Sequence, residues 1–231
     1  MKKINDLAML DNYITKHHIV EFFNKDITPY MELFLFKRNE YICREDESIY
    51  YLFFLVEGKA KVFTTLSNGK SLLLCFYGPL QLLGDVEMIK VQNATSNVQI
   101  IEDTYCIGIP LEKVRELLLD DAKFLRFICD SLGGKLNRCS KNSSINLLYP
   151  LENRIASYIL ATGVTVKGNG KSVMVFDENL TQIAELLGTS YRHLLRTLNT
   201  LCSKGAMVKK DTHYEVTNEP ILKSLAADLY K

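Results

Sequence analysis

Between residues 31 and 110, short apolar or alternating runs are separated by turn-forming residues. Glu57-Gly58 interrupts one of these runs, and Asn68-Gly69 is a strong hairpin signal because both residues accept a positive φ. Many short strands with tight turns are typical of a β-sandwich or β-roll. The pattern predicts strands at residues 50–56, 59–63 and 71–77, and two more short strands around Glu102-Asp103.

Apolar residues follow a helical spacing before and after this β region. Residues up to about 27 predict one or two short helices, residues 111–119 predict another, and residues 121–147 predict a much longer one. Tyr149-Pro150 marks a domain boundary, because proline is tolerated at a helix start and disfavoured in its interior. The next residues predict a helix at 151–162 and a hairpin at 164–176 that turns at Lys167-Gly168-Asn169-Gly170.

The long helix carries its apolar residues in a narrow stripe, with members spaced three and four apart: Leu125, Ile128, Leu132, Leu136 and Cys139. Such a stripe with polar flanks favours pairing with the same helix of a second copy. The alternative is a helix that packs only on its own β-roll. Gly133-Gly134 lowers helix propensity, which either close backbone approach across a dimer axis or a hinge would offset.

Residues 179–203 predict two helices joined by a tight turn. Asn179 and Gln182 form a capping pair at the start of the first helix. Gly188 ends that helix and permits the turn, and Thr189-Ser190 caps the next helix. This is the plan of the helix-turn-helix, whose second helix enters the major groove of DNA.

The second helix has an apolar face of leucines, and Arg192, Arg196, Asn199 and Ser203 lie opposite it. Arginine reads guanine through two hydrogen bonds, and asparagine can read adenine. The alternative is that the two arginines merely solvate a surface helix. The cap, the glycine turn and the preceding helix favour DNA recognition instead.

After Gly205, residues 206–216 predict a short hairpin, or wing, in which Lys209 and Lys210 are placed to contact phosphates. The predicted fold class is therefore α+β. Residues 1–148 are expected to form a β-roll sensor domain with a long dimerisation helix. Residues 149–231 are expected to form a winged helix-turn-helix domain.

Composition sets limits on these interpretations. The 231 residues are 47% apolar and 24% charged, as in a globular protein, and the net charge of +1 indicates no polyanion partner by itself. No apolar run reaches the ~20 residues of a membrane-spanning helix, and no signal peptide is visible, so no membrane partner and a cytoplasmic location are expected. The six cysteines predict reduced, mostly buried thiols, with Cys139 and Cys202 as candidates for redox behaviour.

The order of the elements, and above all the segment LTQIAELLGTSYRHLLRTL at residues 180–198, resembles the Crp/Fnr superfamily of bacterial regulators, the relatives of the cyclic-AMP receptor protein. The resemblance covers about residues 30–220 and looks closest to the YeiL-type branch. It implies a cupin-like β-roll related to cyclic-nucleotide-binding domains, a long dimerisation helix and a winged helix. The implied function is transcription regulation by a homodimer on a two-fold symmetric double-stranded DNA operator, with RNA polymerase as a partner and a small-molecule effector allowed.

By this resemblance, the base-reading positions of the family fall on Tyr191, Arg192 and Arg196. Arg196 matches the family, whereas relatives commonly show arginine followed by glutamate or serine at the other two positions. A different operator is therefore expected. The complete set of residues predicted to contact DNA is Asn179, Thr189, Ser190, Tyr191, Arg192, His193, Arg196, Asn199, Lys209 and Lys210.

The resemblance also locates a candidate effector site. Gly84-Asp85 aligns with the Gly-Glu of the phosphate-binding cassette, and the position of its arginine falls on Ala94, followed by Thr95. Without the bidentate arginine contact to the cyclic phosphate, no tight binding of cyclic AMP is expected. The adenine-contacting positions of the family fall near Cys139 and Ser140.

Two other functions are weighed against this one. A metal cupin enzyme needs several histidines inside the roll, but no histidine lies between His18 and His193. The first cysteine is Cys43, so the N-terminal cysteine cluster of iron-sulfur relatives is missing, and the few histidines do not favour haem. No catalytic residue, metal site or cofactor is expected. The other alternative is a ligand-binding or protein-interaction module with a degenerate helix-turn-helix.

Overall fold

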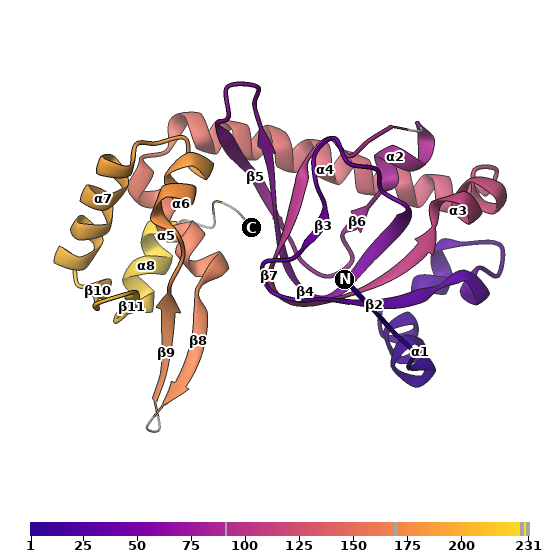
Figure 1. The fold of residues 1–231 in the computed structure, drawn as a ribbon, viewed down its shortest axis with the longest axis horizontal. Helices are drawn as coiled ribbons and strands as arrows, with labels where there is room; N and C mark the ends of the chain where they lie inside the picture. The colour runs from indigo at the N-terminus through magenta and orange to yellow at the C-terminus, as the bar shows by residue number, and fades with distance from the viewer. Residues whose placement is uncertain (91, 169–170, 227–228, 230–231) are drawn as a thin grey trace. The chain divides into compact units, whose positions relative to one another are not determined.

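The computed structural model describes residues 1–90, 92–168, 171–226 and 229 of the chain (Figure 1). They form two compact units: Met1–Thr64 with Cys75–Cys139, and Thr65–Leu74 with Ser140–Lys231. The predicted α+β class, with a β-roll, a long helix and a winged helix-turn-helix, is confirmed. Asn169-Gly170, part of one predicted turn, lies outside the described residues.

An antiparallel sheet forms the β-roll. Its strands follow the order β1 (Lys2–Ile4), β2 (Glu32–Phe36), β7 (Asn97–Pro110), β4 (Tyr51–Thr65) and β5 (Ser71–Tyr77), while β3 (Tyr41–Cys43) pairs with β7 and β6 (Leu82–Leu83) pairs with β4. The alternation in β5 buries Leu73, Cys75 and Tyr77, as expected for a strand with one face in the core. Strand β1 was not predicted, because its three residues carry too little periodicity.

Two of the predicted strand boundaries are wrong. Residues 51–65 form one strand, and so do residues 97–110. Glu57-Gly58 makes a bulge instead of a strand end, since the pairing of β4 with β7 shifts register there. Gly58 has a φ of 99°, and a Cβ on it would lie 2.4 Å from Oγ1 of Thr104. Only glycine therefore allows this close approach of the two strands.

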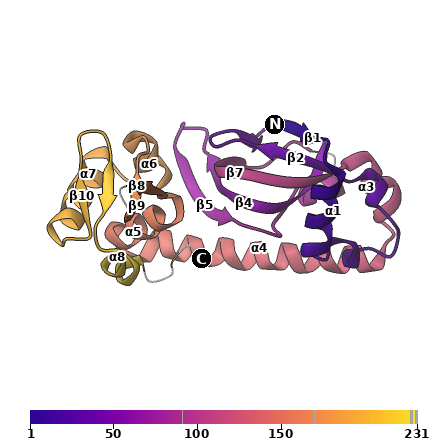
Figure 2. The same cartoon turned by 90° about the horizontal axis from the view of Figure 1, so that it is seen from below.

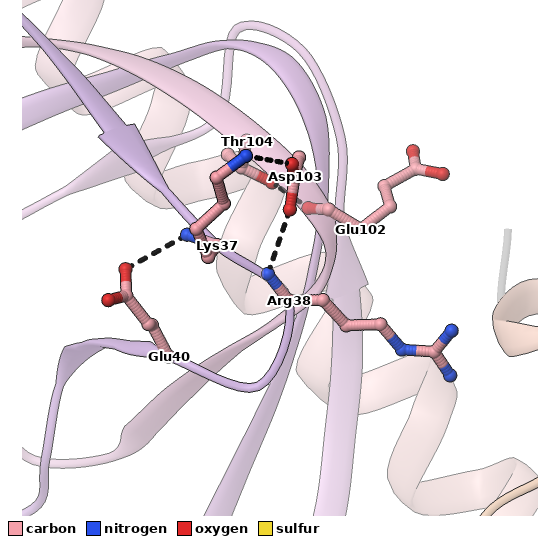
Figure 3. A network of polar contacts seen from close by, with 6 residues as sticks. All are labelled: Lys37, Arg38, Glu40, Glu102, Asp103 and Thr104. Atoms are coloured by element: carbon pink, nitrogen blue, oxygen red, sulfur yellow. Dashed lines mark hydrogen bonds and ion pairs between the residues drawn. The ribbon is translucent and has the colours of Figure 1, made fainter. Parts of the chain in front are cut away.

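The part of β7 opposite the bulge carries a network of polar contacts (Figure 3). The carboxylate of Asp103 accepts hydrogen bonds from Lys37 Nζ at 2.6 Å and from the amide of Arg38 at 3.0 Å. Thr104 Oγ1 donates to the carbonyl of Glu102 at 2.7 Å. Glu102-Asp103 resembles a turn signal in the sequence, yet Asp103 lies within a strand and binds the residues that follow β2.

Helices cover the roll and complete its core. They are α1 (Leu7–Lys16), the 3-10 helices η1 (Ile19–Phe22) and η2 (Thr28–Tyr30), α2 (Asp85–Ile89) and α3 (Leu111–Leu118). One buried cluster joins Ile19 to Leu52, Phe54 and Ile107 of the central strands. Phe22 stacks on Phe127 with ring centroids 3.9 Å apart. The apolar side chains near the amino terminus are therefore part of the same core as the strands.

The long helix α4 (Ala122–Leu148) runs along one side of the roll (Figure 2). Phe124 and Ile128 are fully buried in the core of the roll, whereas Leu136 is 71% exposed. The prediction of one stripe was therefore wrong for Ile128, which packs on its own chain, and Leu132 also packs partly against this core. At 100° per residue, the face that meets the roll lies beside the face that carries Leu125 and Leu136, so helical spacing alone does not separate the two faces.

The second unit contains helices α5 (Leu151–Thr162), α6 (Leu180–Leu186), α7 (Tyr191–Ser203) and α8 (Glu219–Ala226). Its sheet has the order β10 (Met207–Lys209), β11 (Tyr214–Val216), β9 (Lys171–Phe176) and β8 (Val164–Gly168). Leu151, Ile155 and Ile159 are buried on one face of α5, as their spacing predicted. Across the described part of the chain, every helix is too short or too polar to cross a membrane.

Asp121 both starts α4 and ties it to the amino-terminal region. Its Oδ1 accepts from the amides of Lys123 and Phe124, and its Oδ2 accepts from the amide of Asn24 at 2.7 Å. Burial opposes the ionisation of Asp121, but these hydrogen bonds outweigh it and hold the pKa of Asp121 below its usual value.

Replacing Asp121 with alanine is expected to lower the free energy of unfolding by about 1–2 kcal/mol, because α4 loses its cap. Since the pKa of Asp121 is lower in the folded state, this contribution is present above about pH 4 and is lost as the pH falls through the folded-state pKa. Urea unfolding across the acid range measures the difference between wild type and Asp121→Ala. A difference that stays constant down to the lowest pH would contradict this role.

Candidate functional site

The turn between α6 and α7 is fixed by caps on both helices. Asn179 Oδ1 accepts from the amides of Thr181 and Gln182, and Ser190 Oγ accepts from the amide of His193 at 3.2 Å. Gly188 adopts a φ of 60° between the helices, which favours glycine. Local signals therefore define both helix starts and the turn, as predicted from the sequence.

Helix α7 has one buried and one exposed face. Leu194, Leu198 and Leu201 are buried, whereas Arg192, Arg196 and Asn199 lie opposite them and are exposed. Tyr191 and His193, on the flanks of the leucine face, are exposed as well. Thr197 is also buried, and its hydroxyl donates to the carbonyl of His193, so this polar side chain is satisfied within the helix. The faces are those that the leucine spacing predicted.

The guanidinium groups of Arg192 and Arg196 form no ion pair or side-chain hydrogen bond within the described part of the chain. Two positive charges one turn apart are thus left to solvent on a capped helix. Thr189, just before the helix, has its hydroxyl 3.3 Å from Nδ1 of His193. This surface can supply cationic, hydroxyl and amide donors to an anionic ligand.

Strands β10 and β11 form the predicted wing, and its two lysines differ. Lys209 is exposed. Lys210 Nζ lies 3.6 Å from the carboxylate of Glu215, and Nε2 of His213 lies 3.3 Å from the same carboxylate. Lys210 is therefore partly neutralised within the wing, and Lys209 is the less constrained cation. An ion pair of this exposed kind contributes little to stability.

In the first unit, Gly84-Asp85 starts α2 inside the roll. Gly84 has a φ of 89°, and a Cβ on it would lie 2.5 Å from the carbonyl oxygen of Tyr51. Asp85 is buried, and both of its carboxylate oxygens lie 2.7 Å from Nζ of Lys135 on α4. Lys135 was not predicted as part of the site. Its position seven residues after Ile128 places both on the same face of α4, and this spacing was the one indication in the sequence that Lys135 meets the roll.

Among the described residues, the side-chain partner of Asp85 is Lys135, and none of the other predicted effector-site residues forms a side-chain hydrogen bond with Asp85. Ala94 is buried, and its backbone is paired with Asp46 and Glu47. The side chains of Thr95, Cys139 and Ser140 are exposed. The buried acidic neighbour is instead Glu87, whose pKa is raised above its ordinary value by burial. The interior at α2 thus holds two acidic side chains. Lys135 pairs with Asp85, and the guanidinium of Arg115 donates to the backbone carbonyls of Glu87 and Met88.

Comparison with known proteins places these features in context. Residues 33–121 match the cyclic nucleotide-binding domain family. The chain is 34% identical over 207 residues to Regulatory protein YeiL of Escherichia coli O157:H7, an alignment that covers 90% of this chain and 91% of that protein. It is 25% identical over 182 residues to the Cyclic AMP receptor protein of Thermus thermophilus, covering 77% of this chain and 80% of that protein.

Solved structures share the fold. A CRP-family transcriptional regulator from Thermus thermophilus has a TM-score of 0.66 at 17% identity, covering 86% of this chain and 98% of that one. The c-di-GMP-responsive global regulator CLP of Xanthomonas campestris has a TM-score of 0.63 at 13% identity, covering 91% of this chain and 99% of that one.

Replacing Ser190 with alanine is expected to destabilise α7 by about 1 kcal/mol, because the amide of His193 loses its acceptor. Ser190→Asp keeps an acceptor at the cap and should retain most of the stability. Hydrogen exchange at the α7 amides measures both effects, with Ser203→Ala at the other end of the helix as the control. If aspartate destabilises as much as alanine, capping is not the role of Ser190.

Proposed function

Because the chain belongs to the Crp/Fnr family of regulators, we propose that it is a sequence-specific DNA-binding transcription regulator that acts as a homodimer on a two-fold symmetric operator. The observation that carries the proposal is the exposed face of α7. Arg192 and Arg196 stand one turn apart on it, free of partners among the described residues and opposite the leucines that anchor the helix. In a helix-turn-helix, this face enters the major groove.

Each polar residue on this surface then has an expected contact. Arg192, Arg196 and Asn199 would meet base edges, and the exposed Tyr191 would add a contact from the first residue of the helix. The donors at the two helix starts would bind phosphates and orient the protein: Asn179, Thr189, Ser190 and His193. Lys209 and, more weakly, Lys210 would add phosphate contacts from the wing.

The proposed dimer uses the side of α4 that faces away from the core of the roll. Leu136 is 71% exposed, Cys129 and Cys139 are exposed, and Leu125 is half-buried. Leu132 lies at the edge of this side, since it is half-buried and packs partly against the core of the roll. The spacing of these residues alternates between four and three, as in a two-stranded coiled coil. A Cβ on Gly133 would meet nothing within 4 Å, so this position leaves room for a partner helix. For a regulator of this kind we expect RNA polymerase as a further partner. We expect the cytoplasm as its location.

The proposal does not include control by cyclic AMP. A cyclic phosphate needs a cation at the position of Ala94, and a neutral buried methyl group stands there. Asp85, the counterpart of the family glutamate, already binds Lys135. The alanine at position 94 and the pairing of Asp85 with Lys135 are the two features of this chain that disfavour binding of cyclic AMP.

The operator is found by selection from a random duplex library at two salt concentrations, followed by binding measurements. Arg196→Ala is expected to weaken specific binding by about 1–3 kcal/mol and to relax the preference at one base pair of each half-site. Arg126→Ala, an exposed arginine on α4, is the matched control. Unchanged affinity and selectivity for Arg196→Ala would favour a degenerate helix-turn-helix.

A phosphate contact behaves differently from a base contact. Lys209→Ala is expected to weaken binding to all sequences about equally and to reduce the slope of log affinity against log salt by about 1. Titrations of the selected operator and of a scrambled duplex over a range of salt measure this. A loss confined to the selected operator would assign base recognition to Lys209 instead.

Leu136→Glu is expected to dissociate the dimer, because it places a charge in the proposed apolar contact between two α4 helices. Sedimentation velocity measures the oligomeric state, and Val20→Glu, at another exposed apolar residue of the same unit, is the control. A wild-type monomer that binds the operator as tightly as the dimer would end the dimer proposal. The half-sites are expected about 34 Å apart, one turn of DNA.

Calorimetry with cyclic AMP is expected to show no binding tighter than about 10 μM, since the charge-assisted contacts to the phosphate are missing. Replacing Ala94 with arginine tests whether that single cation is the missing element. A dissociation constant at or below about 10 μM for the wild type would overturn the expectation.

A further inference from the structure

The ammonium group of Lys135 is bound inside the β-roll, and each of its N–H donors has an acceptor there. Its Nζ lies 2.7 Å from each carboxylate oxygen of Asp85 and 2.8 Å from the carbonyl oxygen of Leu82. An ammonium has three N–H donors, and these three acceptors use them all. The ring of Tyr77 lies beneath it, with 5.6 Å between Nζ and the ring centroid.

The surroundings of this site select a cation and disfavour an anion. Glu87 is buried on the same short helix as Asp85, and Ala94 brings no positive charge. Lys135 itself is only 16% exposed, and its charge is matched by Asp85. A phosphate beside Asp85 would meet two buried carboxyl groups and would have to displace Lys135 from Asp85.

The next turn of α4 repeats the attachment. Arg138 Nη2 donates to the side-chain carbonyl of Gln81, and its guanidinium lies 6.0 Å from the centroid of the Tyr77 ring. Lys135 and Arg138 therefore hold α4 to one segment of the roll, residues 77–85. Leu82 and Asp85 of this segment are buried, so the segment is itself fixed in the core.

We propose that the β-roll carries its own ligand: the Lys135 ammonium occupies the cation site formed by Asp85, Leu82 and Tyr77 and holds α4 on the roll without a small-molecule effector. The regulatory part of this inference rests on the proposed DNA-binding function. The regulator binds its operator with no effector added. A compound that acts at this site is a primary amine, which supplies N–H donors and a positive charge, and not a cyclic nucleotide.

The experiment removes the internal ligand and then supplies it from solution. Lys135→Ala deletes three methylene groups and the ammonium, which n-propylamine replaces. Tetramethylammonium carries the charge but no N–H donor, so it is the control ligand. Lys123→Ala, an exposed lysine of the same helix, is the control variant. Lys135→Met fills the space of the four side-chain carbons of lysine without the ammonium, and so guards against an effect of the cavity alone.

Hydrogen exchange of the whole chain is the first readout. Lys135→Ala and Lys135→Met are expected to speed exchange of the amides in residues 124–138 by more than about tenfold, because Asp85 is left buried without its partner. The amides of α5 and α7 should be unchanged and serve as an internal control for folding. n-Propylamine should slow exchange in Lys135→Ala only, and the double variant Asp85→Asn/Lys135→Met should exchange more slowly than Lys135→Met.

Operator affinity is the second readout. Wild type should bind without added ligand, and Lys135→Ala should bind at least about tenfold more weakly until n-propylamine is added. Equal effects of n-propylamine and tetramethylammonium, or unchanged exchange in both Lys135 variants, would overturn the cation site. Amine-dependent exchange with unchanged operator affinity would overturn its regulatory role. If wild type binds no duplex, the proposed function fails, while the exchange data still decide whether Lys135 is the internal ligand.

Discussion

Phe124 and Ile128 place one face of α4 in the core of the β-roll, and this packing decides which side chains of the helix remain outside. Asp121 fixes where the helix begins, through the amides of Lys123 and Phe124. With the start and one face fixed, Lys135 is turned toward Asp85 and Leu136 toward solvent. The same rotation of one helix thus provides both the internal ion pair and the surface proposed for the dimer.

The ion pair between Asp85 and Lys135 connects the fold to the proposed regulation. Two buried charges are costly unless each is fully paired, and the carbonyl of Leu82 completes the pairing of Lys135. One relative of this chain, from Thermus thermophilus, is named Cyclic AMP receptor protein. In this chain the position of the expected arginine is Ala94, which carries no charge, and the cation that binds Asp85 is Lys135.

The helix-turn-helix depends on a different kind of interaction. Asn179 and Ser190 satisfy amides at the two helix starts, Gly188 supplies the positive φ of the turn, and the leucines of α7 hold the helix in place. All of these are contacts between residues close together in the chain, or within one small core. Recognition by Arg192 and Arg196 would need no rearrangement of this unit, because both side chains already face solvent on a capped helix.

These differences explain what the sequence by itself determined. It predicted the α+β class, the helix-turn-helix with its caps and turn, the wing and the start of α5, because each rests on local signals within a few turns of one helix or one hairpin. The tertiary structure alone decided that β4 is continuous through Gly58 and β7 through Asp103, that Ile128 belongs to the roll, and that Lys135 binds Asp85. Each of these depends on residues far apart in the chain that only folding brings together, as for Gly58 and Thr104, which are 46 positions apart. Spacing along the chain gives the period of a helix, but the neighbour that each face meets is set by the packing of the whole unit.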